Sequence, residues 1–128
     1  MSSEETLDKE LLDKAFEWLE KAKSDFDDAE YNLKDDREDT GAFLLHQACE
    51  KALKALQIVE KEEYDYSHDL LELASDEALN EFGELFKKLN PVYVGTRYPG
   101  IDGEIENLDE LNRKVGEALE WIEKQLNQ

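Results

Sequence analysis

The stretch from Ala42 to Leu56 reads AFLLHQACEKALKAL, and it decides the fold class. Apolar residues recur in it at steps of three and four, which is the period of an α-helix. They cover more of the helical circumference than a single apolar face does. A helix of this kind is either buried centrally in its domain or pairs with a partner. We expect it to run from Ala42 to about Lys61.

Helical periodicity continues on both sides of this stretch. Upstream, the same steps run from Leu7 to Leu33 and stop at a polar break, residues 35–41. Downstream we expect three further helices. The first is short, covers His68–Ala74 and is capped by Ser67. The second begins at Ser75 or Asp76 and is ended or loosened at Asn90–Pro91. The last covers Leu108–Leu126, with Asn107 and Glu110 as a loose capping box.

The helices predict an all-α fold, an antiparallel up-and-down bundle of four to five helices. A chain of 128 residues favours a single domain, 1–128, with its core at about 7–126. No stretch has the length and apolarity of a membrane span, and the start shows no secretory signal. Cys49 is the single cysteine, so an intrachain disulfide is excluded, which fits a cytoplasmic location. It lies among apolar residues, and we expect it to be a small buried hydrophobic residue.

The charge is strongly acidic, with 34 Asp and Glu against 15 Lys and Arg, a net of −19. This balance argues against extended nucleic-acid binding and against an anionic membrane surface. The negative charge is unevenly spread along the chain. Residues 62–86 contain no Lys or Arg, whereas acidic and basic residues nearly balance in the predicted second helix. The acidity therefore leaves room for a small basic site, and it equally offers a surface to a basic partner.

Candidate binding residues lie in that balanced helix. One helical face carries four polar residues at spacings of four, four and three, namely His46, Glu50, Lys54 and Gln57, with Lys51 beside them. An imidazole and two ammonium groups could hold a phosphate or a partner carboxylate. The alternative is a Glu50–Lys54 pair on a solvated stripe, which contributes only a few tenths of a kcal/mol.

Two other places add candidates. His68 is either a structural residue packed against neighbouring tyrosines or a second polar group in the same cleft as His46. Arg97 and Tyr98 lie in a segment rich in Gly and Pro, where they could bind a phosphate and a base, or where Arg97 could tie the loop to the bundle. Two histidines and one cysteine make a zinc site improbable, and no nucleotide-binding glycine motif is present.

Several of these segments resemble one family in the same order along the chain. They are Ala15–Ala22 with Asp25 and Ala29, then Ala42–Leu56, His68-Asp69-Leu70, Leu89–Tyr93 and Arg97-Tyr98-Pro99. Together they resemble the prokaryotic HEPN domains (higher eukaryotes and prokaryotes nucleotide-binding), over nearly the whole chain. The resemblance implies a helical bundle that commonly homodimerises and is often encoded beside a minimal nucleotidyltransferase, as in toxin–antitoxin pairs, with nucleotide binding proposed for related domains.

Many members of that superfamily are metal-independent ribonucleases with an Arg followed, after four to six residues, by a His. Here eight residues separate Arg37 from His46, and no His follows Arg97 or Arg113. The catalytic pair therefore cannot be carried over. What matches is a set without it, a nucleotide- or partner-binding group: His46, Glu50, Lys51, Lys54, His68, Arg97 and Tyr98.

The leading hypothesis is a non-catalytic HEPN-like domain that homodimerises and binds a nucleotide, a minimal nucleotidyltransferase, or both. It needs no cofactor or metal, a nucleotide being the possible ligand. The rivals are a divergent ribonuclease that uses His46 or His68 with Arg97, and a structural bundle without a ligand.

Overall fold

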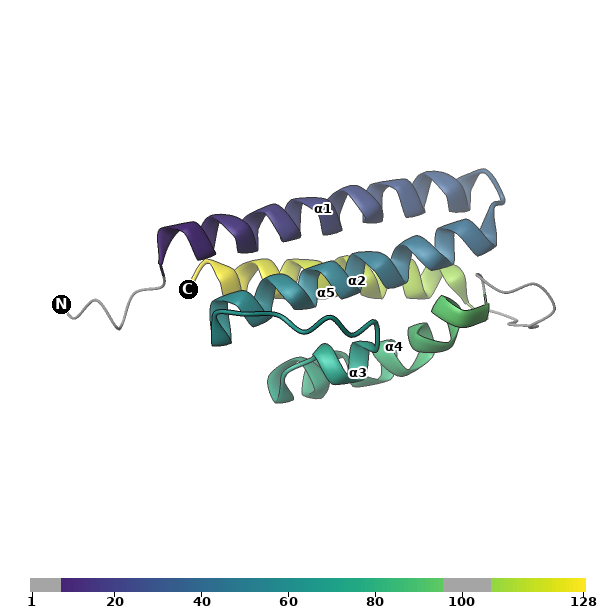
Figure 1. The fold of residues 1–128 in the computed structure, drawn as a ribbon. Coiled ribbons are helices and arrows are strands. Elements are labelled where there is room, and N and C mark those ends of the chain that lie inside the picture. The colour runs from purple at the N-terminus through teal and green to yellow at the C-terminus, as the bar shows by residue number, and fades with distance from the viewer. Residues whose placement is uncertain (1–7, 96–106) are drawn as a thin grey trace.

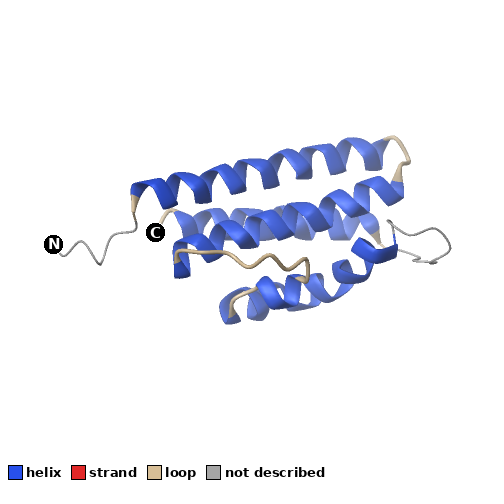
Figure 2. Ribbon diagram, viewed as in Figure 1, coloured by secondary structure: helices blue, strands red, loops and turns tan. Residues whose placement is uncertain are grey.

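The computed structural model describes residues 8–95 and 107–128, and the side chains of residues 8–92 and 107–128. These ranges contain the helices α1 (Lys9–Lys34), α2 (Glu38–Lys61), α3 (Leu70–Leu73), α4 (Asp76–Gly95) and α5 (Leu108–Leu126). They contain no strand (Figure 2), so the predicted all-α class is confirmed. No helix in the same ranges is both long and apolar enough to cross a bilayer.

Helix α2 is the centre of the bundle. It runs antiparallel to α1, with α5 alongside and with α3 and α4 forming a further layer below it (Figure 1). It contacts all four of the other helices. Of the two explanations for its broad apolar surface, central burial is therefore the one that the structure shows.

Small side chains let α1 lie close to α2. Ala15, Ala22 and Ala29 recur every seventh residue of α1 and are fully buried, so they form one stripe along the helix. The larger side chains of the core come mainly from the other helices and include Leu45, Leu53, Phe86, Leu89, Val115 and Ile122. Cys49 is buried among them, as expected, and burial raises the pKa of its thiol.

The turn between α1 and α2 is shorter than predicted. α2 begins at Glu38 and not at Ala42, so only residues 35–37 form the break. Asp36 makes the reversal with a left-handed φ of 59°. Gly41 lies inside α2, where a Cβ would be 2.6 Å from Cδ2 of Leu33. This glycine serves close helix packing, and interpreting it as part of the break was wrong.

The cap of α3 was also predicted wrongly. Helix α3 covers Leu70–Leu73, and its cap is Asp69, whose carboxylate accepts a hydrogen bond of 2.9 Å from the Leu71 N–H. Ser67 lies two residues earlier. Its hydroxyl oxygen accepts a bond of 3.0 Å from the Asp69 N–H and so supports the cap residue.

Helices α4 and α5 differ from prediction at one end each. Helix α4 continues through Pro91 to Gly95, and its non-helical residue is Phe82. Pro91 falls near the end of α4, where the missing N–H removes a single helical bond. Helix α5 has the predicted bounds, but Asn107 takes a left-handed conformation and makes no side-chain cap bond, so the expected capping box is absent.

Replacing Gly41 by Ala tests the close approach of α1 and α2. We expect Gly41→Ala to lower the free energy of unfolding by about 1–3 kcal/mol, because the new Cβ overlaps the branched part of Leu33. Gly83→Ala in α4 is the matched control, since a Cβ there meets nothing within 4 Å. It should raise the free energy of unfolding by about 0.5–1 kcal/mol through helix propensity. Urea denaturation measures both, and an equal stabilisation by the two changes would contradict the packing account.

Candidate functional site

A row of polar side chains on α2 is buried inside the bundle. The polar row consists of His46, Glu50, Lys54 and Gln57, which are 0%, 5%, 5% and 6% exposed. Buried polar groups are costly unless they are paired. The partners come mainly from the strap, the irregular residues 62–69 that run back along α2 from its end (Figure 1).

Glu50 is the hub of the polar row. Its Oε2 accepts a hydrogen bond of 3.0 Å from Nζ of Lys54. Nδ1 of His68, in the strap, lies 3.1 Å from both carboxylate oxygens of Glu50. Nδ1 of His46 lies 3.9 Å from Oε1. One buried carboxylate thus joins two positions of α2 to the strap. The alternative of a Glu50–Lys54 pair on a solvated stripe is right about the pair and wrong about its exposure.

His46 is kept neutral at physiological pH. Burial is the main cause and lowers the pKa of His46 to about 4. The carboxylate of Glu50, the Asn90 side chain and the backbone of His68 act in the opposite direction, and the His68 side chain adds to the lowering. A neutral, buried imidazole suits a structural hydrogen-bonding role better than anion binding.

Gln57 fastens the middle of the strap. Its amide oxygen accepts a bond of 2.8 Å from the Asp65 N–H, and its Nε2 donates to the Asp65 carboxylate and to the Leu73 carbonyl, at 3.1 Å each. Lys61 adds an ion pair of 3.2 Å with Asp65. One side chain of α2 therefore holds both the strap and α3.

Asn90 of α4 fastens the end of the strap. Its Nδ2 donates to the Asp69 carboxylate at 2.7 Å, and its Oδ1 accepts from the Leu70 N–H at 2.9 Å. This geometry explains why an Asn precedes Pro91 at this point of the chain. The Asn side chain ties α4 to the start of α3.

Aromatic rings pack beside the polar row. The aromatic row consists of Trp18 in α1 and of Tyr64 and Tyr66 in the strap, with ring centroids 5.0 Å and 5.4 Å apart in edge-on contacts. Nζ of Lys54 lies 5.8 Å from the centroids of both Trp18 and Tyr64. Lys54 is therefore held by a carboxylate on one side and by π-faces on the other.

The predicted site residues separate into three groups. The structure brings His46, Glu50, Lys54 and His68 together, and of these only the side chain of His68 is well exposed, at 55%. Lys51 lies apart from them, in an ion pair with Asp25 of α1. Arg97 and Tyr98 fall outside the described residues.

Other contributors to this region were not among the predicted site residues. The helical spacing predicted Gln57 on the face of His46, Glu50 and Lys54, but not its bonds to the strap. Asn90 was considered only as the residue before Pro91 and as part of the segment Leu89–Tyr93 that resembles the family. The contacts of Tyr64 and Trp18 depend on the path of an irregular strap, for which the sequence has no periodic signal.

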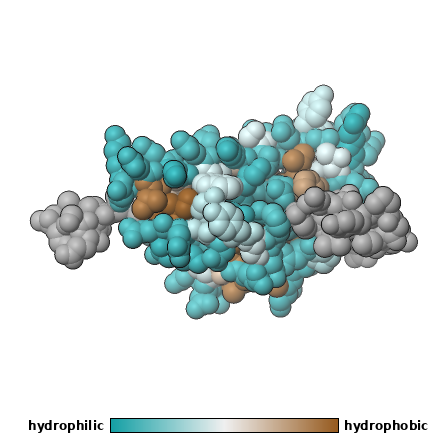
Figure 3. Space-filling view, viewed as in Figure 1, coloured by the Kyte–Doolittle hydropathy of each residue, from teal (hydrophilic) through white to brown (hydrophobic). Residues whose placement is uncertain are grey.

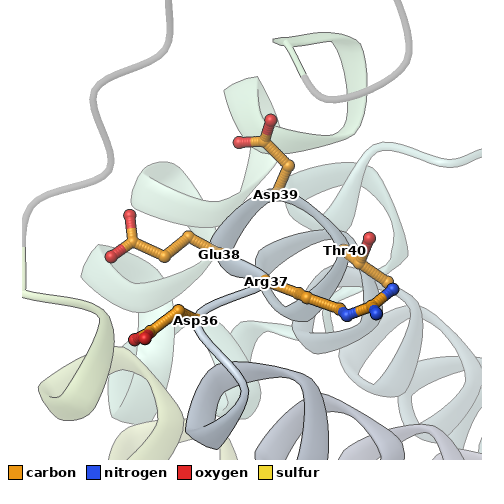
Figure 4. Close-up of a pocket in the computed structure, with 5 residues that line it drawn as sticks. All are labelled: Asp36, Arg37, Glu38, Asp39 and Thr40. Carbon is orange, nitrogen blue, oxygen red and sulfur yellow. The ribbon is translucent and has the colours of Figure 1, made fainter.

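A hollow of about 350 Å³ lies elsewhere, at the turn between α1 and α2. It is lined by the consecutive residues Asp36, Arg37, Glu38, Asp39 and Thr40, whose side chains spread apart and do not converge on a common point (Figure 4). All five are exposed. In the described ranges, moreover, no three His, Cys, Asp or Glu side chains form a group that could hold a metal ion.

Comparison with known proteins gives a family. The family model described as HEPN domain matches residues 15–125, which is most of the chain. The chain belongs to the HEPN domain family. The resemblance inferred from the sequence is thereby confirmed.

Solved structures of similar fold agree with this. The crystal structure of ST0689, an archaeal HEPN homologue, superposes with a TM-score of 0.71 at 22% identity and covers 88% of this chain and 97% of its own. The crystal structure of TT1696 from Thermus thermophilus gives a TM-score of 0.60 at 25% identity, covering 89% of this chain and 94% of its own. No curated protein matches the chain.

The geometry also bears on the ribonuclease motif of HEPN relatives. Arg37 occupies the N-cap position of α2 without a side-chain cap bond, is exposed, and pairs with Asp35 at 2.8 Å. His46 lies nine residues further along, which is about 13 Å of helix rise, and is fully buried. These two side chains do not meet over one phosphate.

Acid should destabilise the fold through His46. Unfolded His46 takes up a proton near pH 6.5, whereas folded His46 does so only near pH 4. Between these values the unfolded state binds more protons, so stability falls as the pH drops through this window. The loss reaches roughly 3 kcal/mol at its lower end. Urea denaturation at neutral pH and near pH 4 should show this loss in the wild type but not in His46→Gln. A pH-independent difference between the two proteins would refute it.

Removing the charge of Glu50 should strongly destabilise the bundle. Glu50→Gln leaves Lys54 buried without a carboxylate, and we expect a loss of about 3–5 kcal/mol in the free energy of unfolding. The double variant Glu50→Gln, Lys54→Met should lose less than the sum of the single changes. Glu117→Gln, at the exposed Arg113–Glu117 pair of 3.2 Å, is the control and should cost at most about 0.5 kcal/mol. Additive effects of the two buried changes would show that the pair is not coupled.

Proposed function

We propose that this chain is a non-catalytic HEPN domain that homodimerises and binds a partner protein of the minimal nucleotidyltransferase class, in a cytoplasmic toxin–antitoxin-type module. The observation that carries the proposal is the internal use of the polar row. Glu50, Lys54 and Gln57 all bond to groups of the same chain, and His46 is buried. Polar groups of the kind expected in a catalytic or anion-binding cleft thus hold the strap in place instead.

The ion pairs of the lysines weigh against a nucleotide as the main ligand. A phosphate at Lys54 would have to displace Glu50, and a phosphate at Lys51 would have to displace Asp25. Both exchanges leave a carboxylate without its cation, and at Lys54 that carboxylate is buried. A nucleotide remains the second candidate ligand, and the exposure of His68 beside this cluster is what favours it.

The surface supports a protein partner. The net charge of −19 repels extended RNA and favours a complementary basic surface. The face drawn in Figure 3 is mostly hydrophilic, with small separate hydrophobic patches. Such a surface fits association with a polar rim around local apolar anchors.

Helix α1 supports dimerisation. It lies at the edge of the bundle and, of the other helices in the described ranges, contacts only α2 and α5, while its Trp18 packs against Tyr64 of the strap. Leu11, Phe16, Phe26 and Leu33 pack against the core of this chain but stay partly exposed at its edge, and Leu12 is partly exposed as well. A second copy could cover this edge in an isologous contact.

Sedimentation velocity tests both associations. At micromolar concentrations we expect the chain alone to sediment as a dimer. We also expect a faster-sedimenting complex when a minimal nucleotidyltransferase of the same genome, preferably from an adjacent gene, is added. A bovine serum albumin mixture controls for nonspecific association.

Three results would point elsewhere. A strict monomer that forms no complex contradicts the proposal. Nucleotide binding in calorimetry that disappears in Lys51→Ala/Lys54→Ala, with no partner complex, favours the second candidate. Metal-free RNA cleavage that disappears in His46→Ala or Arg97→Ala would establish the ribonuclease alternative.

A further inference from the structure

The strap presents one aromatic ring to solvent. Tyr66 is 84% exposed, although its ring contacts Tyr64, which in turn contacts Trp18. A lone exposed tyrosine on a loop is ordinary, but this ring is the outer end of a packed aromatic row. Its position is therefore set by contacts that reach back to α1.

The inner rings of the aromatic row already face cations of the chain. Lys54 lies over both Trp18 and Tyr64, and Nζ of Lys21 lies 5.9 Å from the Trp18 centroid. Among the described residues no cation lies over Tyr66. Each inner ring thus has a cation of the chain near its face, whereas the outer ring, Tyr66, has none among the described residues.

The strap is held rigidly in spite of its irregular backbone. Gln57 bonds to Asp65, Glu50 bonds to His68, and Asn90 bonds to Asp69. Tyr66 lies between these anchors. A surface that is ordered before binding loses less conformational entropy on association.

Two exposed acidic residues lie shortly before Tyr66 in the sequence of the strap. Glu62 ends α2 in a left-handed conformation, and Glu63 follows it. Both are exposed and neither forms an ion pair within the part of the chain that the structure describes. The neighbouring Asp65 is already engaged by Lys61. Exposed carboxylates and an open aromatic ring are the groups that a guanidinium binds, by charge and by stacking.

We propose that Tyr66, with Glu62 and Glu63, forms a docking surface for an arginine-bearing segment of a partner protein. This inference rests on the proposed function for the existence of a protein partner, and it adds the surface and the chemistry that this partner must have. An arginine stacked on Tyr66 would give this ring the kind of cation contact that Trp18 and Tyr64 already have.

A second copy of the chain fits this surface poorly. The same segment of a second copy, residues 62–86, would bring nine more acids and no Lys or Arg. Like charges across an interface are unfavourable. The occupant is therefore a different, basic protein.

The test is a titration of the isotope-labelled full chain with a short glycine–serine peptide that carries arginines, followed by amide chemical shifts. We expect shifts concentrated in the strap, and an affinity that falls about three- to tenfold in Tyr66→Ala. Tyr31→Ala is the matched control, because Tyr31 is 73% exposed on the acidic α1. It should leave the affinity unchanged, and the same peptide with lysines in place of arginines should bind more weakly.

Other outcomes would overturn the inference. Shifts spread over all acidic helices, or equal effects of Tyr66→Ala and Tyr31→Ala, would mean general charge attraction. Loss of the dimer in Tyr66→Ala would mean that a second copy occupies the surface. If the wild type binds the nucleotidyltransferase and Tyr66→Ala binds it equally well, this inference fails and the proposed function stands. If no such complex forms, the proposed function fails, and the peptide titration still tests the surface.

Discussion

The architecture depends on one buried charge, the carboxylate of Glu50 in the central helix α2. Lys54 and His68 bond to it, and their positions determine how the strap lies against α2. A carboxylate buried in this way is tolerable only while its cation and hydrogen bonds are in place. The strap in turn places Tyr64 against Trp18 and leads into α3, so one ion cluster connects α1, α2 and the lower layer of the bundle.

This arrangement changes the interpretation of the polar residues in α2 from ligand-binding groups to buried groups that hold the strap. In a surface helix they would be free to bind a ligand. In a helix in contact with four others, His46, Glu50, Lys54 and Gln57 are buried, and the last three bond to other groups of the chain. The proposed interaction surface is accordingly on the strap, next to the cluster and not within it. This arrangement agrees with the absence of the Arg–His pair from the sequence, because His46 of α2 is buried and neutral.

The fold could be predicted from the sequence because helical periodicity carries it. The apolar stretch Ala42–Leu56 predicted a central or paired helix, and the bounds of α5 were correct. Local signals were less decisive where tertiary contacts compete with them. Gly41 looked like a helix break but serves close packing, and Pro91 lies near a helix end where its missing N–H costs little. The strap was unpredictable, because its course depends on partners contributed by α2 and α4.

Native-state hydrogen exchange in Glu50→Gln tests the role of this charge most directly. The amides to follow are those of Asp65, Asp69 and Leu70, which donate to the side chains of Gln57, Ser67 and Asn90, respectively. Amides of α1 and α5 are the reference. If Glu50 holds the strap, exchange at the three amides should accelerate much more than exchange in α1 and α5, as expected for local opening. Equal acceleration throughout the bundle, or unchanged protection of the strap, would contradict the account.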